Sequence, residues 1–225
     1  MILAIETATP ICGAALIENQ KIVASRSINE KNVHSEKLLV FIDELFHEAK
    51  TTLQKIDAIA ISIGPGSFTG LRIGLSIAKG LGYAQSKPII TVPTLDSLVM
   101  EYLRTNPSQR NTIICPLIDA RRDEAYFSFF EINNNIPHNL TPYSIAPIQE
   151  IITLAKQYDN VIFIGDGAIK IASHNYTINS NIICNPIAIG MLAEHYWQKK
   201  KNILYEYDFL EPLYIREFYT TAKIQ

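Results

Sequence analysis

The sequence contains few of the residues from which metal centres and disulfide frameworks are built. Its 225 residues include three cysteines, Cys12, Cys115 and Cys184, which lie far apart and form no C-x-x-C pair. The five histidines form no i, i+3 or i, i+4 pair, which excludes the usual helical zinc and iron motifs. We therefore expect reduced thiols and no metal-binding residues.

A surplus of positive charge and long apolar runs are missing as well. Twenty Lys and Arg stand against 22 Asp and Glu, a net charge of -2, so the chain lacks the cations with which nucleic-acid-binding proteins neutralise phosphates. No apolar run approaches the roughly 18 residues needed to span a bilayer, and the first residues carry no basic leader pattern. We expect a cytoplasmic protein that makes no membrane contact and meets tRNA only through partners.

The remaining composition is that of a folded globular protein, with 48% hydrophobic and 19% charged residues. Residues 2–5, 11–17 and 21–28 are short apolar runs with turn residues between them, which predicts three antiparallel strands. A helix over 35–50, a strand over 55–63, a helix over 70–83 and a strand over 88–92 follow. This βββ-α-β-α-β order predicts an α/β fold with a mixed sheet flanked by helices, and it is the repeating half of the actin-like ATPase architecture.

The second half begins near the breaker cluster 106–108, which suggests two lobes, 1–105 and 106–225. Strands are expected at 111–118 and 124–132, joined by a turn in which Asp119, Arg121 and Arg122 could contact a phosphate, a partner or one another. Residues 133–147 are expected to form a loop. A helix over 148–157, a strand over 161–164, a short helix and a last helix near 186–200 complete the prediction, and the last helix is free to pack back on the first lobe.

A glycine-rich segment, 63–74, joins a predicted strand to a predicted helix, where such loops often cradle phosphates. It fits no Walker loop and no dinucleotide fingerprint, and a nucleophile elbow at Ser67 fails because Pro65 and Thr69 stand where glycines are needed. A capped tight turn and an anion site both stay open. The residues that would contact a nucleotide or anion are Glu6, Thr7, Gly64, Gly66, Ser67 and Thr69.

The two predicted helices of the first half are apolar over more than one side. The helix over 35–50 spreads its apolar residues over an arc of about 160°, and the helix over 70–83 has small residues at every fourth position. Such a stripe lets another backbone approach closely, so a second chain is one explanation and burial within one large domain is the other. The expected partner interface consists of Leu38, Leu39, Ile42, Leu45, Phe46, Gly70, Leu71, Gly74 and Ala78.

The segment Gly64 to Gly74 closely resembles the signature of the bacterial TsaB (YeaZ) family, and the resemblance extends over most of the chain. Five further segments resemble family motifs: the opening ILAIETAT, HSEKLL from His34, TVPTL from Thr91, DARRDEAY from Asp119 and PLYIR from Pro212. Glu6 stands where the family commonly has Asp, and Asp123 where Gly is common.

The resemblance implies an actin-like ATPase (ribonuclease H-like) fold and a role in forming N6-threonylcarbamoyladenosine at position 37 of tRNA. In this family the chain is not an enzyme: it dimerises with and activates the TsaD-type transferase, pairs with itself when alone, and is joined by a TsaE-like ATPase. The His-x-x-x-His metal motif of TsaD is absent from the corresponding residues 93–99, so the resemblance implies no cofactor in this chain and leaves ATP or ADP to the level of the complex.

Two rival functions stay open. One is a nucleotide-dependent kinase or ATPase of the same superfamily, which the glycine-rich segment allows. The other is a peptidase, which the sequence disfavours because neither a metal pair nor a Ser-His-Asp arrangement can be assigned.

Overall fold

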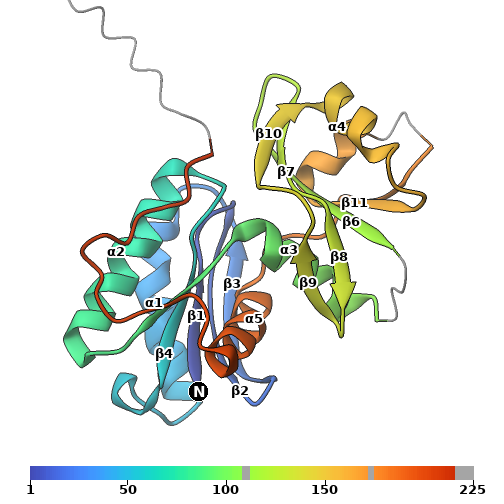
Figure 1. Cartoon of the computed structure of the whole chain (residues 1–225). Helices are drawn as coiled ribbons and strands as arrows, with labels where there is room; N and C mark the ends of the chain where they lie inside the picture. Colours follow the sequence, from blue (N-terminus) through green and yellow to red (C-terminus); the bar gives the residue numbers. More distant parts are fainter. Residues whose placement is uncertain (108–111, 172–174, 216–225) are drawn as a thin grey trace, which may run out of the picture.

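The computed structural model describes residues 1–107, 112–171 and 175–215, which form two lobes, each built on a β-sheet (Figure 1). Ser108 of the predicted lobe boundary, His174, and Arg216 of the last family motif lie outside the described residues. No helix in the described ranges is long and apolar enough to cross a membrane.

The first lobe contains a six-stranded mixed sheet with the order β13-β5-β4-β1-β2-β3. Its strands are β1 (Ile2–Glu6), β2 (Ile11–Glu18), β3 (Lys21–Asn29), β4 (Ala58–Ser62), β5 (Ile89–Val92) and the short β13 (Ile203–Leu204). β1 pairs antiparallel with β2 and parallel with β4. The predicted βββ-α-β-α-β order is confirmed, although β4 begins three residues late because a 3-10 turn (η1, Leu53–Lys55) precedes it.

Helices cover both faces of this sheet, and strand residues alternate between them. Helices α1 (His34–Glu48) and α2 (Phe68–Gln85) pack on the face that carries Leu3 and Ile5. Helix α5 (Pro186–Lys199), from the far end of the sequence, packs on the opposite face with Ile2 and Ala4. Each fully buried Ile or Leu stabilises this arrangement by about 1.5–3 kcal/mol. The two faces of the sheet are therefore covered by different helices, so α1 and α2 are exposed on one side of the lobe and α5 on the other.

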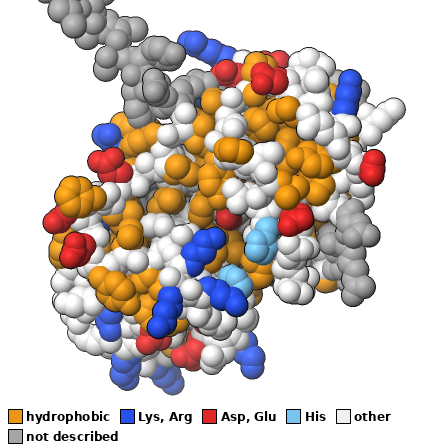
Figure 2. Space-filling model, in the orientation of Figure 1, with side chains coloured by type: hydrophobic (Ala, Val, Ile, Leu, Met, Phe, Trp, Pro, Cys, Tyr) orange, Lys and Arg blue, Asp and Glu red, His pale blue; other side chains and the backbone are white. Residues whose placement is uncertain are grey.

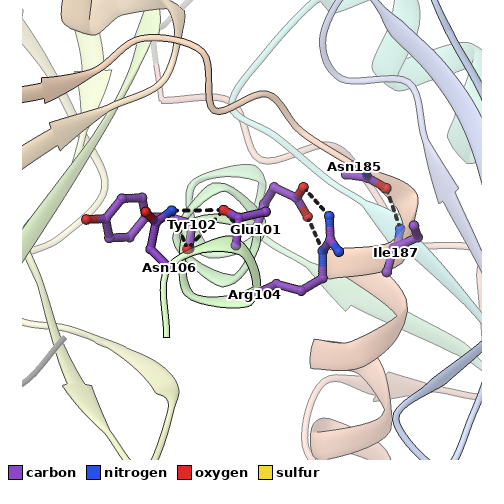
Figure 3. Close-up of polar contacts among 7 residues, drawn as sticks. Glu101, Tyr102, Arg104, Asn106, Asn185 and Ile187 are labelled. Atoms are coloured by element: carbon purple, nitrogen blue, oxygen red, sulfur yellow. Dashed lines mark hydrogen bonds and ion pairs between the residues drawn. The ribbon is translucent and has the colours of Figure 1, made fainter. Parts of the chain in front are cut away.

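Local hydrogen bonds fix where α5 begins and what it touches. The Asn185 side chain accepts a hydrogen bond of 2.9 Å from the Ile187 N–H and so caps the helix start (Figure 3). The buried Glu194 carboxylate accepts backbone N–H bonds of 2.7 Å from Asn19 and 2.5 Å from Gln20. Because Asn19 and Gln20 form the β2–β3 turn, α5 holds that turn against the sheet.

The second lobe has a sheet in the order β10-β7-β6-β11-β12, with β8 pairing with β6 and β9 pairing with β8. Its elements are β6 (Ile113–Asp119), β7 (Glu124–Phe127), β8 (Phe130–Asn133), β9 (Ile136–Asn139), β10 (Ser144–Pro147), α4 (Ile148–Ala155), β11 (Val161–Ile164), η2 (Asp166–Ile171) and β12 (Thr177–Asn179). Two predictions are wrong here. The expected loop 133–147 contains β9 and β10, and the expected strand 124–132 divides into β7 and β8.

Helix α3 (Thr94–Thr105) lies between the lobes and is absent from the sequence-based prediction. Its apolar residues Leu95, Leu98, Val99 and Tyr102 recur at helical spacing, so the sequence carried a signal that the prediction missed. Leu95, Leu98 and Val99 pack with Ile114 and Phe130 of the second lobe. The lobes thus share a continuous apolar contact.

The C-terminal segment 205–215, here called the strap, runs along α2 (Figure 1). The Tyr207 hydroxyl donates to the Lys87 carbonyl, and Tyr83 donates a 2.6 Å hydrogen bond to Asp208. Further along, the Leu213 N–H donates to the Ile63 carbonyl at 2.7 Å. The strap therefore covers one flank of α2 from end to end.

Candidate functional site

Three backbone N–H groups of the glycine-rich loop, those of Gly64, Ser67 and Gly70, are hydrogen bonded within the chain. Gly64 donates to the Thr94 hydroxyl at 3.1 Å, and Ser67 donates to the Ala8 carbonyl at 2.6 Å. The Ser67 side chain caps α2 by accepting from the Gly70 N–H at 3.2 Å. A phosphate cradle needs such N–H groups to be available, so the capped-turn interpretation is the one that the structure supports.

The glycines of α2 allow close contacts inside the chain rather than between chains. A Cβ on Gly70 would overlap the Thr7 carbonyl, and a Cβ on Gly74 would overlap the Thr7 hydroxyl. A Cβ on Gly82 would come within 3.1 Å of the Tyr207 ring of the strap. The small-residue stripe of α2 is therefore turned toward β1 and the strap.

This placement corrects most of the expected partner interface. Seven of its residues are buried against the chain's own sheet, so they do not face a partner: Leu38, Ile42, Leu45, Gly70, Leu71, Gly74 and Ala78. The physical reason is that β1 and its following turn approach α2 as closely as a second helix would. Of the expected set, Leu39 remains 51% exposed and Phe46 is half-buried.

An apolar surface nevertheless remains on the solvent side of the two helices. Arg26 of β3 pairs with Glu44 and Glu48, which turns that flank of α1 toward β3 and the flank carrying Leu39 and Phe46 toward α2. The strap occupies one flank of α2 and leaves the other turned toward α1. We call the resulting surface the outer face; it consists of Leu39, Phe46, Ile73, Ile77 and Gly80. Nothing described lies within 4 Å of a Cβ placed on Gly80.

Glu6 lies fully buried at the end of β1, where the two lobes meet. One carboxylate oxygen accepts hydrogen bonds from the Thr9 N–H at 3.1 Å and the Thr9 hydroxyl at 3.2 Å. The other oxygen and the nearby Ser62 hydroxyl have no hydrogen bond of normal geometry among the described residues. Burial raises the pKa of Glu6 to about 7, and the hydroxyls of Ser62 and Thr9 oppose the shift only in part.

The cavity between the lobes is small and mainly apolar, and its lining contains one acidic residue, Asp166. Its volume is about 110 Å³, compared with about 300–1,000 Å³ for typical ligand pockets. One lining residue, Asp166, is charged, and its carboxylate would repel phosphate. The cavity is lined by Thr9, Pro10, Ile11, Asn29, Leu98, Ile118, Asp166, Ile182, Ile183 and Cys184. A second cavity, of about 100 Å³, lies beside Gly66 and Tyr214 and is mainly apolar.

The six residues expected to contact an anion do not surround a common cavity. Glu6 is sealed from solvent, Thr7 faces α2, and Ser67 caps α2, while Thr69 points outward. Gly64 and Gly66 lie against Leu213 and Ala8. The anion-site hypothesis is therefore not supported by the geometry.

The turn that joins β6 to β7 is stabilised by a lysine side chain, Lys170, that the sequence analysis did not identify. Lys170 of η2 donates a 2.6 Å bond to the Asp119 carboxylate, which also accepts from the Arg121 N–H at 2.7 Å. Partial burial raises the pKa of Asp119, but these bonds outweigh it and the net shift is downward. No group of three or more His, Cys, Asp or Glu side chains within the described ranges could hold a metal ion.

Comparison with known proteins gives the class to which this architecture belongs. A family model described as "TsaD: tRNA N6-adenosine threonylcarbamoyltransferase" matches residues 21–205. The chain is similar in fold to YeaZ from Pseudomonas aeruginosa, with a TM-score of 0.84 and 24% sequence identity over 95% of this chain and 98% of that one. The actin-like fold prediction is therefore confirmed.

Relatives narrow the class further. The tRNA threonylcarbamoyladenosine biosynthesis protein TsaB of Haemophilus influenzae is 29% identical, with 99% of this chain and 96% of that protein covered. TsaB of Buchnera aphidicola subsp. Schizaphis graminum is 30% identical, with coverage of 78% and 82%. The chain belongs to the TsaB (YeaZ) branch of the TsaD family.

Proposed function

We propose that this chain is a non-catalytic subunit in the formation of N6-threonylcarbamoyladenosine on tRNA, and that it binds and activates a TsaD-type transferase through the outer face. The relatives that share its full length are named as biosynthesis proteins of this modified nucleoside. The observation that carries the proposal is the apolar outer face itself. It is unusual because Leu39 at 51% exposure and the unpacked Gly80 sit beside half-buried isoleucines.

The energetics of α2 support a contact at this surface. A glycine in an exposed helix interior costs about 1 kcal/mol relative to alanine. Gly70, Gly74 and Gly82 have close contacts within the chain that offset this cost, but Gly80 has none among the described residues. A facing backbone from a partner would account for a glycine at that position.

The interior of the molecule supports a non-catalytic role. The loop N–H groups of Gly64, Ser67 and Gly70 are hydrogen bonded within the chain, and the cavity between the lobes is small, with Asp166 in an otherwise uncharged lining. Among the described residues, Glu6 is hydrogen bonded to Thr9 and has no cationic partner. These features disfavour the kinase or ATPase alternative. The peptidase alternative gains no group of metal ligands among the residues that the structure describes. In this proposal nucleotide binds at the level of the complex, a TsaE-like ATPase joins it, and the chain alone forms a homodimer.

The test introduces a charge into the outer face and, as a control, at a matched position elsewhere. Leu39→Arg places a cation where apolar contact is expected. Ile169→Arg makes the same kind of change on η2 of the second lobe, at a residue that is 66% exposed. Both variants should fold, because both residues are exposed. Pairing with a TsaD-type protein is then measured by isothermal titration calorimetry, and homodimerisation by light scattering.

We expect Leu39→Arg to weaken pairing by more than about 2 kcal/mol, the threshold for an interface hot spot, and Ile169→Arg to leave it unchanged. If Leu39→Arg pairs as tightly as the wild type, the outer face is not the partner surface. If the wild-type chain shows no pairing at all, the proposed function itself is wrong.

A further inference from the structure

Helix α5 ends in a run of three consecutive exposed lysines: Lys199 is its last residue, and Lys200 and Lys201 follow it. None of the described ion pairs involves them. A cation near a helix C-terminus is favoured by the helix dipole, but that effect fades beyond the last turn. Cations at three consecutive positions exceed what helix stability requires.

The lysines lie close to two histidines, one from each lobe. Partial burial lowers the pKa of His195 on α5 first, and Lys199, His138 and Lys201 lower it further. His138 belongs to β9 of the second lobe, so side chains of both lobes lie near the end of α5. Figure 2 shows His, Lys and Arg side chains gathered on this face. We call His138, His195, Lys199, Lys200 and Lys201 the α5 basic patch.

The acidic groups of this region accept hydrogen bonds within the chain, and one of them, Glu101, is also paired with a cation. Glu101 forms two bonds with Arg104, at 2.9 and 2.7 Å, so this pair adds little net charge (Figure 3). Glu194 accepts the N–H groups of the β2–β3 turn. Asp96 is buried and accepts two tyrosine hydroxyls, and Glu131 accepts from Asn133 at 2.8 Å. Lys199 and Lys200 therefore remain available to an external anion, whereas Lys201 also lies over the Tyr196 ring, 5.4 Å from its centroid, and interacts with the Asp96 carboxylate.

The α5 basic patch and the outer face lie on opposite sides of the first sheet. Helix α5 packs against the face that carries Ile2 and Ala4, whereas α1 and α2 pack against the face that carries Leu3 and Ile5. A protein bound to the outer face would leave the patch uncovered. One chain can therefore contact a protein partner and an anionic polymer at the same time.

We propose that the α5 basic patch binds the phosphate backbone of RNA and supplies a tRNA contact within the assembled complex. The proposal rests on the proposed function, which makes tRNA the substrate of the complex. Lysine clusters typically contact phosphates, whereas lysine is depleted from protein–protein interfaces. Three contacts are few, which agrees with weak binding by a chain whose net charge is -2.

The test compares two triple variants with equal net charge. The patch variant carries Lys199→Gln, Lys200→Gln and Lys201→Gln. The control variant carries the same change at three exposed lysines scattered over the molecule: Lys21, Lys55 and Lys156. Binding of fluorescently labelled, unmodified tRNA is measured by anisotropy at about 50 and about 200 mM salt, for the chain alone and for its complex with a TsaD-type protein.

If the patch makes three phosphate contacts, these contacts alone should weaken RNA binding about 20- to 40-fold between the lower and the higher salt concentration. The patch variant should lose this salt dependence and bind at least about tenfold more weakly at low salt, while the control variant keeps both near the wild-type values. Equal losses in the two variants would show a bulk charge effect and overturn the proposal. Unchanged RNA binding with lost TsaD pairing would overturn it in favour of an acidic protein partner.

Failure of this proposal is distinguishable from failure of the proposed function. Pairing of the wild-type chain with the TsaD-type protein is measured in the same samples without RNA. If pairing fails, the proposed function is wrong, and the measurements on the chain alone still decide whether the patch binds RNA.

Discussion

Replacement of Glu6 by glutamine should make the protein more stable at neutral pH. The folded protein holds a proton on Glu6 up to a pKa of about 7, whereas an unfolded chain releases it near 4.5. Between these values the folded state binds more protons than the unfolded state, so the free energy of unfolding falls as pH rises. This shift corresponds to about 3 kcal/mol, which is present at low pH and lost above about pH 7.

The Glu6→Gln variant removes the charge and keeps the shape. Its side-chain oxygen can still accept the two hydrogen bonds from Thr9, and its amide can donate to the Ser62 hydroxyl, which has no partner of normal geometry. Stability should therefore match the wild type near pH 4.5 and exceed it by up to about 3 kcal/mol near pH 8.

The assay is urea unfolding of both proteins at a series of pH values, and the quantity of interest is the difference between their free energies of unfolding. Asp96 also has a pKa raised by burial, to about 6, and it affects both proteins equally, so the difference isolates Glu6. A difference that stays constant from about pH 4.5 to 8 would refute the assignment of a buried, uncompensated carboxyl at the lobe junction.

Three further predictions follow from the packing of α2 and from the residue inventory. Gly74→Leu should lower the melting temperature because the leucine side chain would overlap Thr7, at a typical overpacking cost of about 1–3 kcal/mol. The folded fraction of this variant should still pair with a TsaD-type protein. A stable variant that loses pairing would contradict the inward orientation of Gly74. Gly80→Ala should raise the stability of the isolated monomer by up to about 1 kcal/mol, measured by urea unfolding at low protein concentration; a loss of stability would reveal an intramolecular contact at this position. Elemental analysis of the purified chain should find no stoichiometric zinc or iron, and one bound metal per chain would overturn the non-catalytic assignment.

The regular alternation of apolar runs and breakers explains why the first lobe was predictable. Residues 2–29 form three strands whose bounds differ by at most one residue from those predicted, because tight turns with polar residues separate them. Helix α3 and strands β9 and β10 escaped prediction for different reasons. The helical spacing of apolar residues in α3 was present in the sequence and was overlooked. The short β9 and β10 contain Pro, and their strand pairing depends on distant partners.

The expected partner interface was harder to predict from the sequence than the strands and helices of the first lobe. The sequence revealed that α1 and α2 are apolar over a wide arc, but it could not reveal which partner covers which part. Thr7 and Tyr207, at opposite ends of the chain, take the positions assigned to a second helix. The burial of Glu6 and the opposing placement of α5 were likewise outside the reach of local pattern, because both depend on long-range packing.

The most direct test of the central claim is reconstitution of the modification on unmodified tRNA with a TsaD-type protein, a TsaE-like ATPase and a supply of threonylcarbamoyl-adenylate, with and without this chain. Modified nucleoside is quantified by mass spectrometry after digestion of the tRNA. We expect modification in the full mixture, a large loss when this chain is omitted or replaced by Leu39→Arg, and none with this chain alone. Full modification without the chain, or modification by the chain alone, would contradict its role as a non-catalytic activating subunit.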